Sequence, residues 1–379
     1  MTNPPPDSPL RILLVNDHLG WDRQIHGVAR LFELWASHLD PKRFSLSVLI
    51  LRPENALGAM FKERGIPIRF LGRGRYDPAT LLDLVRIIRE ERVDVLHLQG
   101  YGGSTFGRVA AWLTGTPALV HFHDTTPNYP LVQHIADLAL RGRAQAYLAV
   151  SESARDCWAR RAGLPPQRVR VLHNCLDVES FRALAPEQSQ AARQRLGIPP
   201  AAPVVGTVTR LFEEKGTRTL LEAAPLLMER HPDLHLVVVG DGPLRGELEA
   251  LAASLGLAQR VRFTGFLADV APVLGSYDVF VLTSWFAEGG CPLPVLEAMA
   301  MARPLVVTDI VDILRDGEDA LVIPPRRPDL LADRVSRLVG DASLRARLVE
   351  RALQRVAAFD VRPYVRELGA LYETLARRG

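Results

Sequence analysis

An acidic residue near a predicted helix start marks the stretch of residues 283–309 as a candidate ligand site. Pro292 and Pro294 favour a first helical turn, where the missing N–H of proline would have no partner anyway. Glu297 then falls within about one turn of the helix start, where unpaired N–H groups and the helix dipole favour anions. A carboxylate at such a helix end can accept hydrogen bonds from hydroxyls while the helix end binds a phosphate. The pattern therefore suits a phosphorylated sugar or a nucleotide.

A basic pair, Arg210 and Lys215, follows the apolar run of residues 204–208. The end of a parallel strand is where open α/β sheets bind their ligands. Arginine offers a fork of donors that suits phosphate oxygens, and lysine offers a compact point charge. Cations placed in this way would stabilise the negative charge that a leaving diphosphate gains. A surface Glu–Lys loop with local salt bridges would explain the same residues.

Glycines gather at the next predicted strand-to-helix turn. Gly240, Gly242 and Gly246 nearly form a dinucleotide-binding fingerprint, with one extra residue. Such a turn equally serves close backbone approach to any ligand. Because no acidic ribose-binding residue stands at the right distance, the glycines alone support no NAD-dependent dehydrogenase. The stretch RVRFTGF, which ends at Phe266, fits a buried strand closed by a glycine turn.

A histidine, His123, follows the apolar run of residues 118–122, and Asp124 is its neighbour. An imidazole beside a carboxylate can donate to a sugar hydroxyl or pass a proton. A structural role at the end of a strand is the alternative. His121 shares the same strand face, and His97 also lies near a strand end. We interpret His97 as structural.

Short apolar runs that alternate with amphipathic stretches must position these residues. Continuous apolar strands separated by helices indicate parallel sheets that are covered on both faces. The fold class is therefore α/β, with two doubly wound, Rossmann-like domains. The predicted strands are residues 12–15, 45–51, 66–71, 93–98, 118–122, 146–150 and 169–172, followed by 204–208, 234–239, 261–263, 279–282, 305–308 and 320–323.

The domain boundary is predicted from a change in composition. Residues 185–203 are rich in Ala, Gln and Pro and show little strand character, which is typical of a linker. We expect an N-terminal domain over residues 1–190 and a C-terminal domain over residues 200–358. An amphipathic helix is expected at about residues 360–379.

Composition narrows the class of protein. The chain has 379 residues and a net charge of +3, which is too weak to indicate a nucleic-acid partner. Its three cysteines have no metal-like spacing, and no signal peptide is apparent at its start. No run of 18 apolar residues is present. We therefore expect a cytoplasmic protein with reduced thiols and no metal site, and leave peripheral attachment to the inner face of a membrane open.

Several of these motifs together resemble a known family. Glu288, Gly289, Gly290 and Glu297, followed by Ala-Met-Ala, are similar to the C-terminal signature of the retaining GT-B glycosyltransferases of family 4, also called glycosyl transferases group 1. The resemblance covers nearly the whole chain and is strongest over residues 207–325. It implies two Rossmann-like domains with a cleft between them and a last helix that crosses back to the N-terminal domain. It also implies transfer of a sugar from a nucleoside diphosphate to a glycan, lipid-linked or small-molecule acceptor, with retention and without a metal or other cofactor.

The resemblance also implies roles for the candidate residues of the C-terminal half. Arg210 and Lys215 would bind the donor diphosphate, and Glu297 the ribose. Glu288 would act on the sugar hydroxyls beside the turn of Gly289 and Gly290. The glycines Gly240 and Gly242 would line the donor pocket, and the backbone near Phe266 would meet the base.

For the N-terminal half the resemblance implies a smaller set. His123 would contact the donor sugar and, with Glu288, would be a catalytic residue. The loop that contains Gly20 and Gly27 resembles the acceptor-facing loop of the family, although its glycines are separated here.

Two departures from the family pattern lie close together. Eight residues separate Glu288 from Glu297 where the family usually has seven, and the loop after Asp309 is shorter than usual by about three or four residues. They favour an altered donor preference or a catalytically impaired nucleotide-sugar-binding relative. A nucleotide-sugar epimerase with the GT-B fold is a further alternative. The sugar, the base, the acceptor and the oligomeric state do not follow from the sequence.

Overall fold

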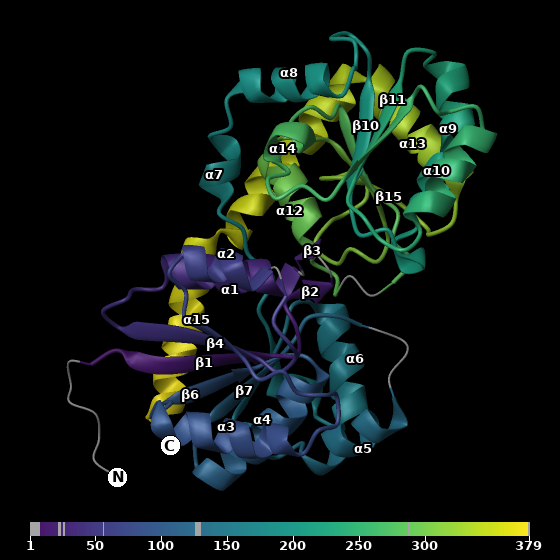
Figure 1. Cartoon of the computed structure of the whole chain (residues 1–379). Helices are drawn as coiled ribbons and strands as arrows, with labels where there is room; N and C mark the ends of the chain where they lie inside the picture. Colours follow the sequence, from purple (N-terminus) through teal and green to yellow (C-terminus); the bar gives the residue numbers. More distant parts are fainter. Residues whose placement is uncertain are drawn as a thin grey trace. The chain divides into compact units, whose positions relative to one another are not determined.

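The chain divides into two compact units, Met1–Asn174 with Val361–Gly379 and Cys175–Asp360. We call them unit 1 and unit 2. The computed structural model describes residues 8–21, 24–25, 27–55, 57–125, 130–286 and 289–377. Each unit is built on a parallel β-sheet with helices on its faces (Figure 1). The strands of both sheets fall within two residues of the ends predicted from the sequence.

The boundary between the units lies earlier than expected. The predicted linker, residues 185–203, contains helix α8 (Pro186–Arg195), which packs on α11 (Ala271–Leu274) of unit 2. The Arg193 side chain of α8 donates to the backbone oxygens of Pro200, Ala202 and Ser276. An exposed helix rich in Ala and Gln has the composition of a linker, so only these contacts assign it to unit 2.

Unit 1 contains a seven-stranded sheet in the order β5-β4-β1-β6-β7-β8-β9. A two-stranded hairpin, β2 with β3, lies in the loop after β1. The strands are β1 (Leu10–Asn16), β2 (Gly20–Trp21), β3 (Gln24–Ile25), β4 (Phe44–Ile50), β5 (Ile68–Phe70), β6 (Val95–Leu98), β7 (Ala118–Phe122), β8 (Ala146–Ala149) and β9 (Val169–Val171). The helices are α1 (Gly27–His38), α2 (Leu57–Glu63), α3 (Ala79–Glu90), α4 (Tyr101–Thr114), α5 (Leu131–Ala139), α6 (Glu152–Ala162), the 3-10 helix η1 (Pro166–Arg168) and α15 (Val361–Ala376).

The two faces of this sheet carry different side chains, because successive residues of a strand point to opposite faces. One face packs apolar residues such as Leu13, Leu98 and Val120 against α3, α4 and α6. The opposite face, under α1 and α15, includes His97 and His121. Helix α15 contacts α1, β1 and β6, so the last helix of the chain is part of unit 1, as predicted (Figure 1).

Unit 2 contains a six-stranded sheet in the order β12-β11-β10-β13-β14-β15. Its strands are β10 (Val204–Val208), β11 (His235–Val239), β12 (Val261–Gly265), β13 (Val279–Leu282), β14 (Leu305–Thr308) and β15 (Leu321–Ile323). Besides α8 and α11, its helices are α7 (Val178–Arg182), η2 (Glu213–Lys215), α9 (Thr217–Arg230), α10 (Arg245–Ser254), α12 (Leu293–Ala300), α13 (Pro328–Gly340), α14 (Ala342–Val356) and η3 (Ala357–Phe359).

The strand order of unit 2 reverses between β10 and β13. From β10 the chain proceeds through β11 to β12 on one side, and β13, β14 and β15 follow on the other. In open α/β sheets ligands bind outside the carboxyl ends of the strands at such a switch point. A ligand site of unit 2 is therefore expected at the loops after β10 and β13. Within the described part of the chain, no helix has the length and apolar character to cross a membrane.

Candidate functional site

The loops after β10 and β13 are joined to each other at the switch point of unit 2. The backbone N–H of Trp285 donates to the carbonyl oxygen of Glu214 at 2.8 Å, and the Thr283 hydroxyl donates to that of Lys215 at 3.3 Å. Gly216 has a φ of +63°, and a Cβ there would lie 2.1 Å from the carbonyl oxygen of Thr283. Lys215 is thus held at the carboxyl edge of the sheet on a loop with little freedom to move.

Glycines fix the neighbouring loops by close backbone contact. A Cβ on Gly240, whose φ is +130°, would lie 1.8 Å from the carbonyl oxygen of Thr209, and one on Gly242 would lie 2.4 Å from that of Leu211. The N–H of Leu211 in turn donates to the carbonyl oxygen of Asp241 at 2.8 Å. The loop that carries Arg210 therefore packs directly on the glycine turn after β11. A side chain at either glycine would separate the two loops.

The same edge continues to β12. The N–H of Gly240 donates to the carbonyl oxygen of Gly265 at 2.9 Å, which places the next residue, Phe266, beside the glycine turn. Phe266, the first residue after β12, is 38% exposed, whereas phenylalanine side chains are usually buried. Arg210 also lies on this edge, with its guanidinium over the Phe212 ring at 5.0 Å. This edge of the sheet therefore carries the basic side chain of Arg210, the ring of Phe266 and the backbone of the glycine turn.

The turn before α12 completes the edge. Gly289 and Gly290 both have positive φ values, +59° and +74°, which favour glycine. The N–H of Asp312, in the short loop after β14, donates to the carbonyl oxygen of Gly290 at 2.9 Å. The two departures from the family pattern are therefore in direct contact. The catalytic residue predicted beside this turn, Glu288, lies outside the described residues.

Glu297 is the fifth residue of α12, which begins after Pro292 as predicted. Its side chain is fully buried. A carboxylate in this position reaches a ligand only if the groups over it move when the ligand binds. Glutamate side chains are rarely buried completely, so a carboxylate here is a candidate for a functional residue.

An aromatic–cation pair that sequence reasoning missed lies beside the Lys215 loop. The Arg326 guanidinium stacks on the Trp285 ring at 3.7 Å from its centroid, and the Arg326 backbone has a φ of +58°. The indole Nε1 of Trp285 has no hydrogen-bond partner among the described residues. The sequence signal for this residue was a tryptophan three positions after the end of β13, a strand at the switch point. Its flat face and free donor could serve ligand binding.

Unit 1 contains a row of polar rings, of which Tyr372, His97 and His121 are buried and His123 is half-buried. The Tyr372 hydroxyl of α15 lies 2.7 Å from Nδ1 of His97, and Nε2 of His97 lies 3.2 Å from Nδ1 of His121. The His121 and His123 ring centroids are 4.1 Å apart. Trp35 stacks on both His97 and His121, at 5.2 and 6.0 Å. This row of rings ends at His123, which directly follows the last residue of β7.

Burial determines the charge of these histidines. It lowers the pKa of His97 and of His121 well below the usual range, and it lowers the pKa of His123 to about 3. All three rings are therefore neutral near pH 7. A neutral imidazole can donate one N–H hydrogen bond to a sugar hydroxyl, but it does not carry a proton to give away as an imidazolium.

The loop after β1 meets the start of α4 at the switch point of unit 1. The Asp17 carboxylate accepts from the backbone N–H groups of Gly102 and Gly103, at 3.0 and 3.1 Å. Gly20 lies in the hairpin that follows, and Gly27 is the first residue of α1. The protein's own carboxylate thus occupies the N-terminus of α4. Sequence reasoning missed Asp17 because its partners lie 85 residues further along the chain.

Both units are similar to known protein families. Residues 25–180 match the family model described as Glycosyltransferase Family 4, and residues 202–341 match the one described as Glycosyl transferases group 1. An alpha-D-kanosaminyltransferase from Streptomyces kanamyceticus is 34% identical over 280 residues, which are 69% of this chain and 72% of that protein. A phosphatidyl-myo-inositol mannosyltransferase from Mycobacterium tuberculosis is 30% identical over 334 residues, 83% and 84% of the two chains. The chain belongs to glycosyltransferase family 4.

Solved structures agree with the fold of this glycosyltransferase. Anabaena HepE in complex with UDP-glucose matches with a TM-score of 0.84 at 22% identity, over 97% of this chain and 100% of that one. The predicted family and the two-domain GT-B fold are confirmed. The relatives' names support a glycosyltransferase and give no support to the epimerase alternative.

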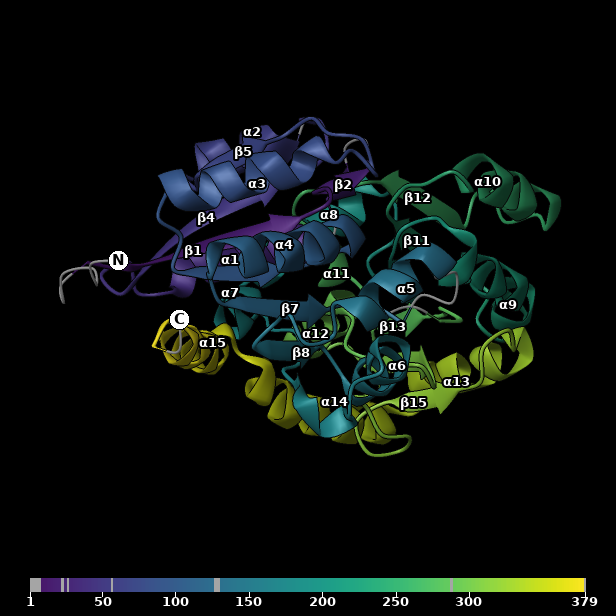
Figure 2. The same ribbon diagram turned by 90° about the horizontal axis from the view of Figure 1, so that it is seen from below.

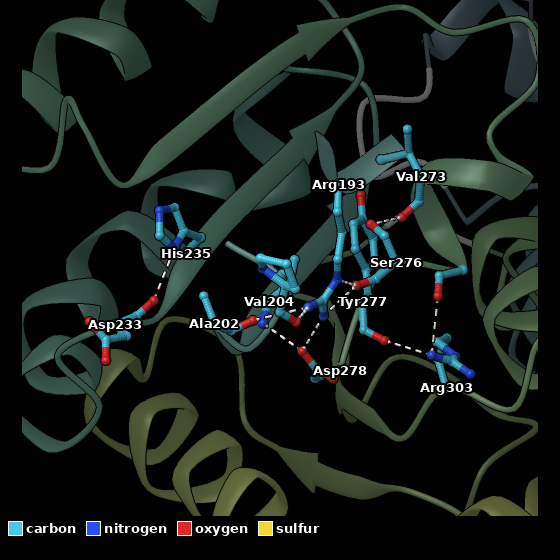
Figure 3. Close-up of polar contacts among 12 residues, drawn as sticks. Arg193, Ala202, Val204, Asp233, His235, Val273, Ser276, Tyr277, Asp278 and Arg303 are labelled. Carbon is cyan, nitrogen blue, oxygen red and sulfur yellow. Dashed lines mark hydrogen bonds and ion pairs between the residues drawn. The ribbon is translucent and has the colours of Figure 1, made fainter. Parts of the chain in front are cut away.

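A cavity of about 940 Å³ in unit 2 lies away from this site. Arg193 and Arg303 line it, at the amino ends of β10 and β13 (Figure 3). Arg193 pairs with Asp278 at 2.7 Å, and Arg303 donates to the carbonyl oxygens of Met301 and Tyr277 at 2.8 and 2.9 Å. Because these arginines already bind carbonyl and carboxylate oxygens at the opposite edge of the sheet, we interpret their role as structural. Among the described residues, no three His, Cys, Asp or Glu side chains are grouped to hold a metal.

Proposed function

We propose that this glycosyltransferase transfers a sugar from a nucleoside-diphosphate sugar to an acceptor with retention of anomeric configuration. The observation that carries the proposal is the junction of the Lys215 loop with the strand end at Thr283–Trp285, at the switch point of unit 2. It brings a cation, a glycine turn and a helix start to the edge where open α/β sheets bind nucleotides. HepE, a protein of the same fold, carries UDP-glucose in its solved structure.

The donor roles follow from charge and position. Lys215 and Arg210 would neutralise the diphosphate, whose leaving oxygen gains negative charge as the sugar departs. The backbone of Gly240 and Gly242 would approach the donor closely, and Phe266 would lie beside the base. We propose that these cations take the role that a bound metal has in other transferases, so that no metal is needed.

The sugar roles are divided between the units. Glu288, Gly289 and Gly290 would contact the sugar hydroxyls from unit 2. The neutral ring of His123 would donate a hydrogen bond to the sugar from unit 1, and the loop with Gly20 and Gly27 would face the acceptor. The acceptor is a glycan, a lipid-linked sugar or a small molecule. Relatives include a kanosaminyltransferase and a phosphatidylinositol mannosyltransferase, so both polar and lipid-anchored acceptors suit the family.

The proposed setting is the cytoplasm, with peripheral attachment to the inner face of the membrane. A lipid-anchored acceptor stays at the membrane surface, so an enzyme that used it would have to work there. No nucleic-acid partner is proposed, because the net charge of +3 gives no strong basic field.

A direct test combines binding and product analysis. Nucleotide sugars with different bases and sugars are screened by thermal shift, since a ligand that binds the folded state raises its stability by mass action. The best donor is then incubated with acceptor candidates, and the anomeric configuration of the product is read by NMR. Retention supports the proposal, whereas an inverted product overturns it.

The role of Glu297 is tested separately, because its side chain is fully buried and would have to become accessible to bind a ligand. If it binds the ribose, Glu297→Gln weakens binding of the bare nucleoside diphosphate by about tenfold or more, the usual loss for a hydrogen bond to a charged group. Glu229→Gln, an exposed glutamate of α9, is the matched control. Equal affinity of Glu297→Gln and wild type in calorimetry would remove Glu297 from the site.

A catalytically impaired relative is the second candidate. The contact of the shortened loop with the glycine turn, Asp312 to Gly290, favours it, because both departures from the family pattern lie at this place. Donor binding without transfer to any acceptor would support this candidate. We also expect the sugar to add less than about 1 kcal/mol to the affinity of the nucleotide if its contacts are reduced.

A further inference from the structure

Helix α5 of unit 1 is amphipathic, but its apolar side faces away from the protein and its polar side faces the protein. Its apolar side chains Leu131, Val132, Ile135 and Leu138 are exposed by 73%, 57%, 58% and 37%. At 100° per residue these positions form one stripe along the helix. A helix that packs on a protein core normally buries such a stripe.

The opposite side of α5 is polar and faces the protein. Gln133 donates to the hydroxyl of Thr105 on α4 at 2.7 Å, and Asp137 pairs with Arg108 of α4. Both members of this ion pair are buried, with side-chain exposures of 6% and 2%. Removing one partner of a buried ion pair leaves the other charge buried and uncompensated, so the pair holds the helix in this orientation. The apolar stripe is therefore fixed outward.

The end of α4 extends the apolar surface. Residues further along α4 contact residues further along α5 and the loop after it. The pairs are Thr105 with Gln133, Arg108 with Asp137, and Trp112 with Arg143. The two helices thus run in the same direction, and Figure 2 shows α4, α5 and α6 in one part of unit 1. Trp112 and Leu113 are 59% and 47% exposed. We call Trp112, Leu113, Leu131, Val132, Ile135 and Leu138 the α4–α5 face.

The charge beside the α4–α5 face is positive. Arg141 and Arg143 are exposed, and the Arg143 guanidinium lies 4.4 Å from the Trp112 ring centroid. Over residues 101–145 the acidic residues are Asp124 and Asp137, and Asp137 is buried against Arg108. An exposed tryptophan with an arginine over its ring is typical of groups that sit at a membrane–water boundary.

We propose that the α4–α5 face binds the surface of a membrane that contains anionic lipids. The apolar side chains would enter the boundary between headgroups and acyl chains, and Arg141 and Arg143 would bind lipid phosphates. This inference gives the peripheral attachment proposed above a place on the molecule. It is measured without donor or acceptor, so its failure leaves the proposed transfer untouched.

A second copy of the chain fits this face less well. Two faces brought together would enclose Arg141 and Arg143 of both copies in one interface, and within residues 101–145 the acidic residues are Asp124 and the buried Asp137. Stable protein–protein interfaces also use about 20–30 residues a side, and this face has six apolar ones. Anionic lipid complements both the charge and the small apolar area.

The experiment is co-sedimentation of the full chain with vesicles of phosphatidylcholine alone or mixed in equal parts with phosphatidylglycerol. We expect binding to the mixed vesicles at about 0.1 M salt and much weaker binding at about 0.5 M, because salt screens exposed charges. Leu131→Ser with Ile135→Ser, and separately Arg141→Gln with Arg143→Gln, should each lower the partition constant by about tenfold or more. Leu82→Ser, at an equally exposed leucine of α3, is the matched control and should bind like wild type.

Trp112 supplies a second readout that does not depend on sedimentation. Its emission should shift to the blue when anionic vesicles are added, and the shift should be absent from Trp112→Phe. The proposal is overturned if either double variant binds vesicles as wild type does. It is also overturned if wild type ignores both vesicles but self-associates in a way that Leu131→Ser with Ile135→Ser abolishes, since a second copy would then be the occupant.

Discussion

The carboxyl edges of the two sheets are built by different means. In unit 2 the edge consists of backbone turns that interlock, with Gly216, Gly240 and Gly242 each placed where a Cβ would meet a carbonyl oxygen. In unit 1 the edge depends on side chains that come from distant parts of the sequence, such as Tyr372 on His97. A turn is encoded locally, and a side-chain network is not. The first kind of edge can therefore be read from motifs, and the second only from the folded chain.

The largest effect is expected at the cation of unit 2. Lys215→Ala should lower the rate of transfer by two or more orders of magnitude, roughly 3 kcal/mol, because it removes a charge that stabilises the leaving diphosphate. Lys62→Ala removes an exposed lysine of unit 1 that pairs with Glu54, and it should leave the rate unchanged. An unaltered rate in Lys215→Ala would mean that the unit 2 edge does not bind the diphosphate.

The free energy of unfolding should respond differently to a substitution at a glycine of the interlocked turns and at a glycine with open space around it. Gly240→Ala should lower the free energy of unfolding by about 1–3 kcal/mol, since its Cβ would press on the Thr209 carbonyl and its φ is +130°. Gly246→Ala lies in α10, where a Cβ meets nothing within 4 Å, and it should be neutral or stabilising by up to about 1 kcal/mol. Urea unfolding of both variants measures the difference. Equal stabilities would show that the contact at Gly240 relaxes without cost.

The smallest effect is expected in the ring network of unit 1. Tyr372→Phe removes only the hydroxyl that lies 2.7 Å from His97, which should cost about 1 kcal/mol of stability. If the network orients His123, the same variant should also lower kcat while the KM for the donor stays constant. Tyr147→Phe loses a hydrogen bond to the Arg141 carbonyl in the same unit, away from the histidines, and should change stability alone. Identical kinetics for both variants would make the network purely structural.

Much of the fold followed from the sequence because its signals are local. The strands were predicted from continuous apolar runs such as residues 204–208 and 279–282, which parallel sheets bury on both faces. The orientation of helix α5 could not be read from the sequence, because its apolar spacing is the same whether the stripe faces the core or, as here, faces outward. The position of the unit boundary was also missed, since contacts of Arg193 and not composition tie α8 to unit 2.

The residues of the candidate site also differ in how far the sequence alone could indicate their arrangement. Lys215, Gly240 and Gly242 stand next to strand ends in the sequence, and the structure brings their loops together. His97, which we interpret as structural, connects Tyr372 to the ring beside His123. That connection spans 275 residues of sequence, so no spacing rule could have indicated it.

One calorimetric experiment tests the division between the two edges most directly. A nucleoside diphosphate is titrated into wild type, Lys215→Ala and His123→Ala, each shown to be folded by circular dichroism. The account predicts that His123→Ala binds the nucleotide as tightly as wild type although it has lost transfer, and that Lys215→Ala binds it at least about tenfold more weakly. Nucleotide affinity that falls in His123→Ala and persists in Lys215→Ala would contradict the account.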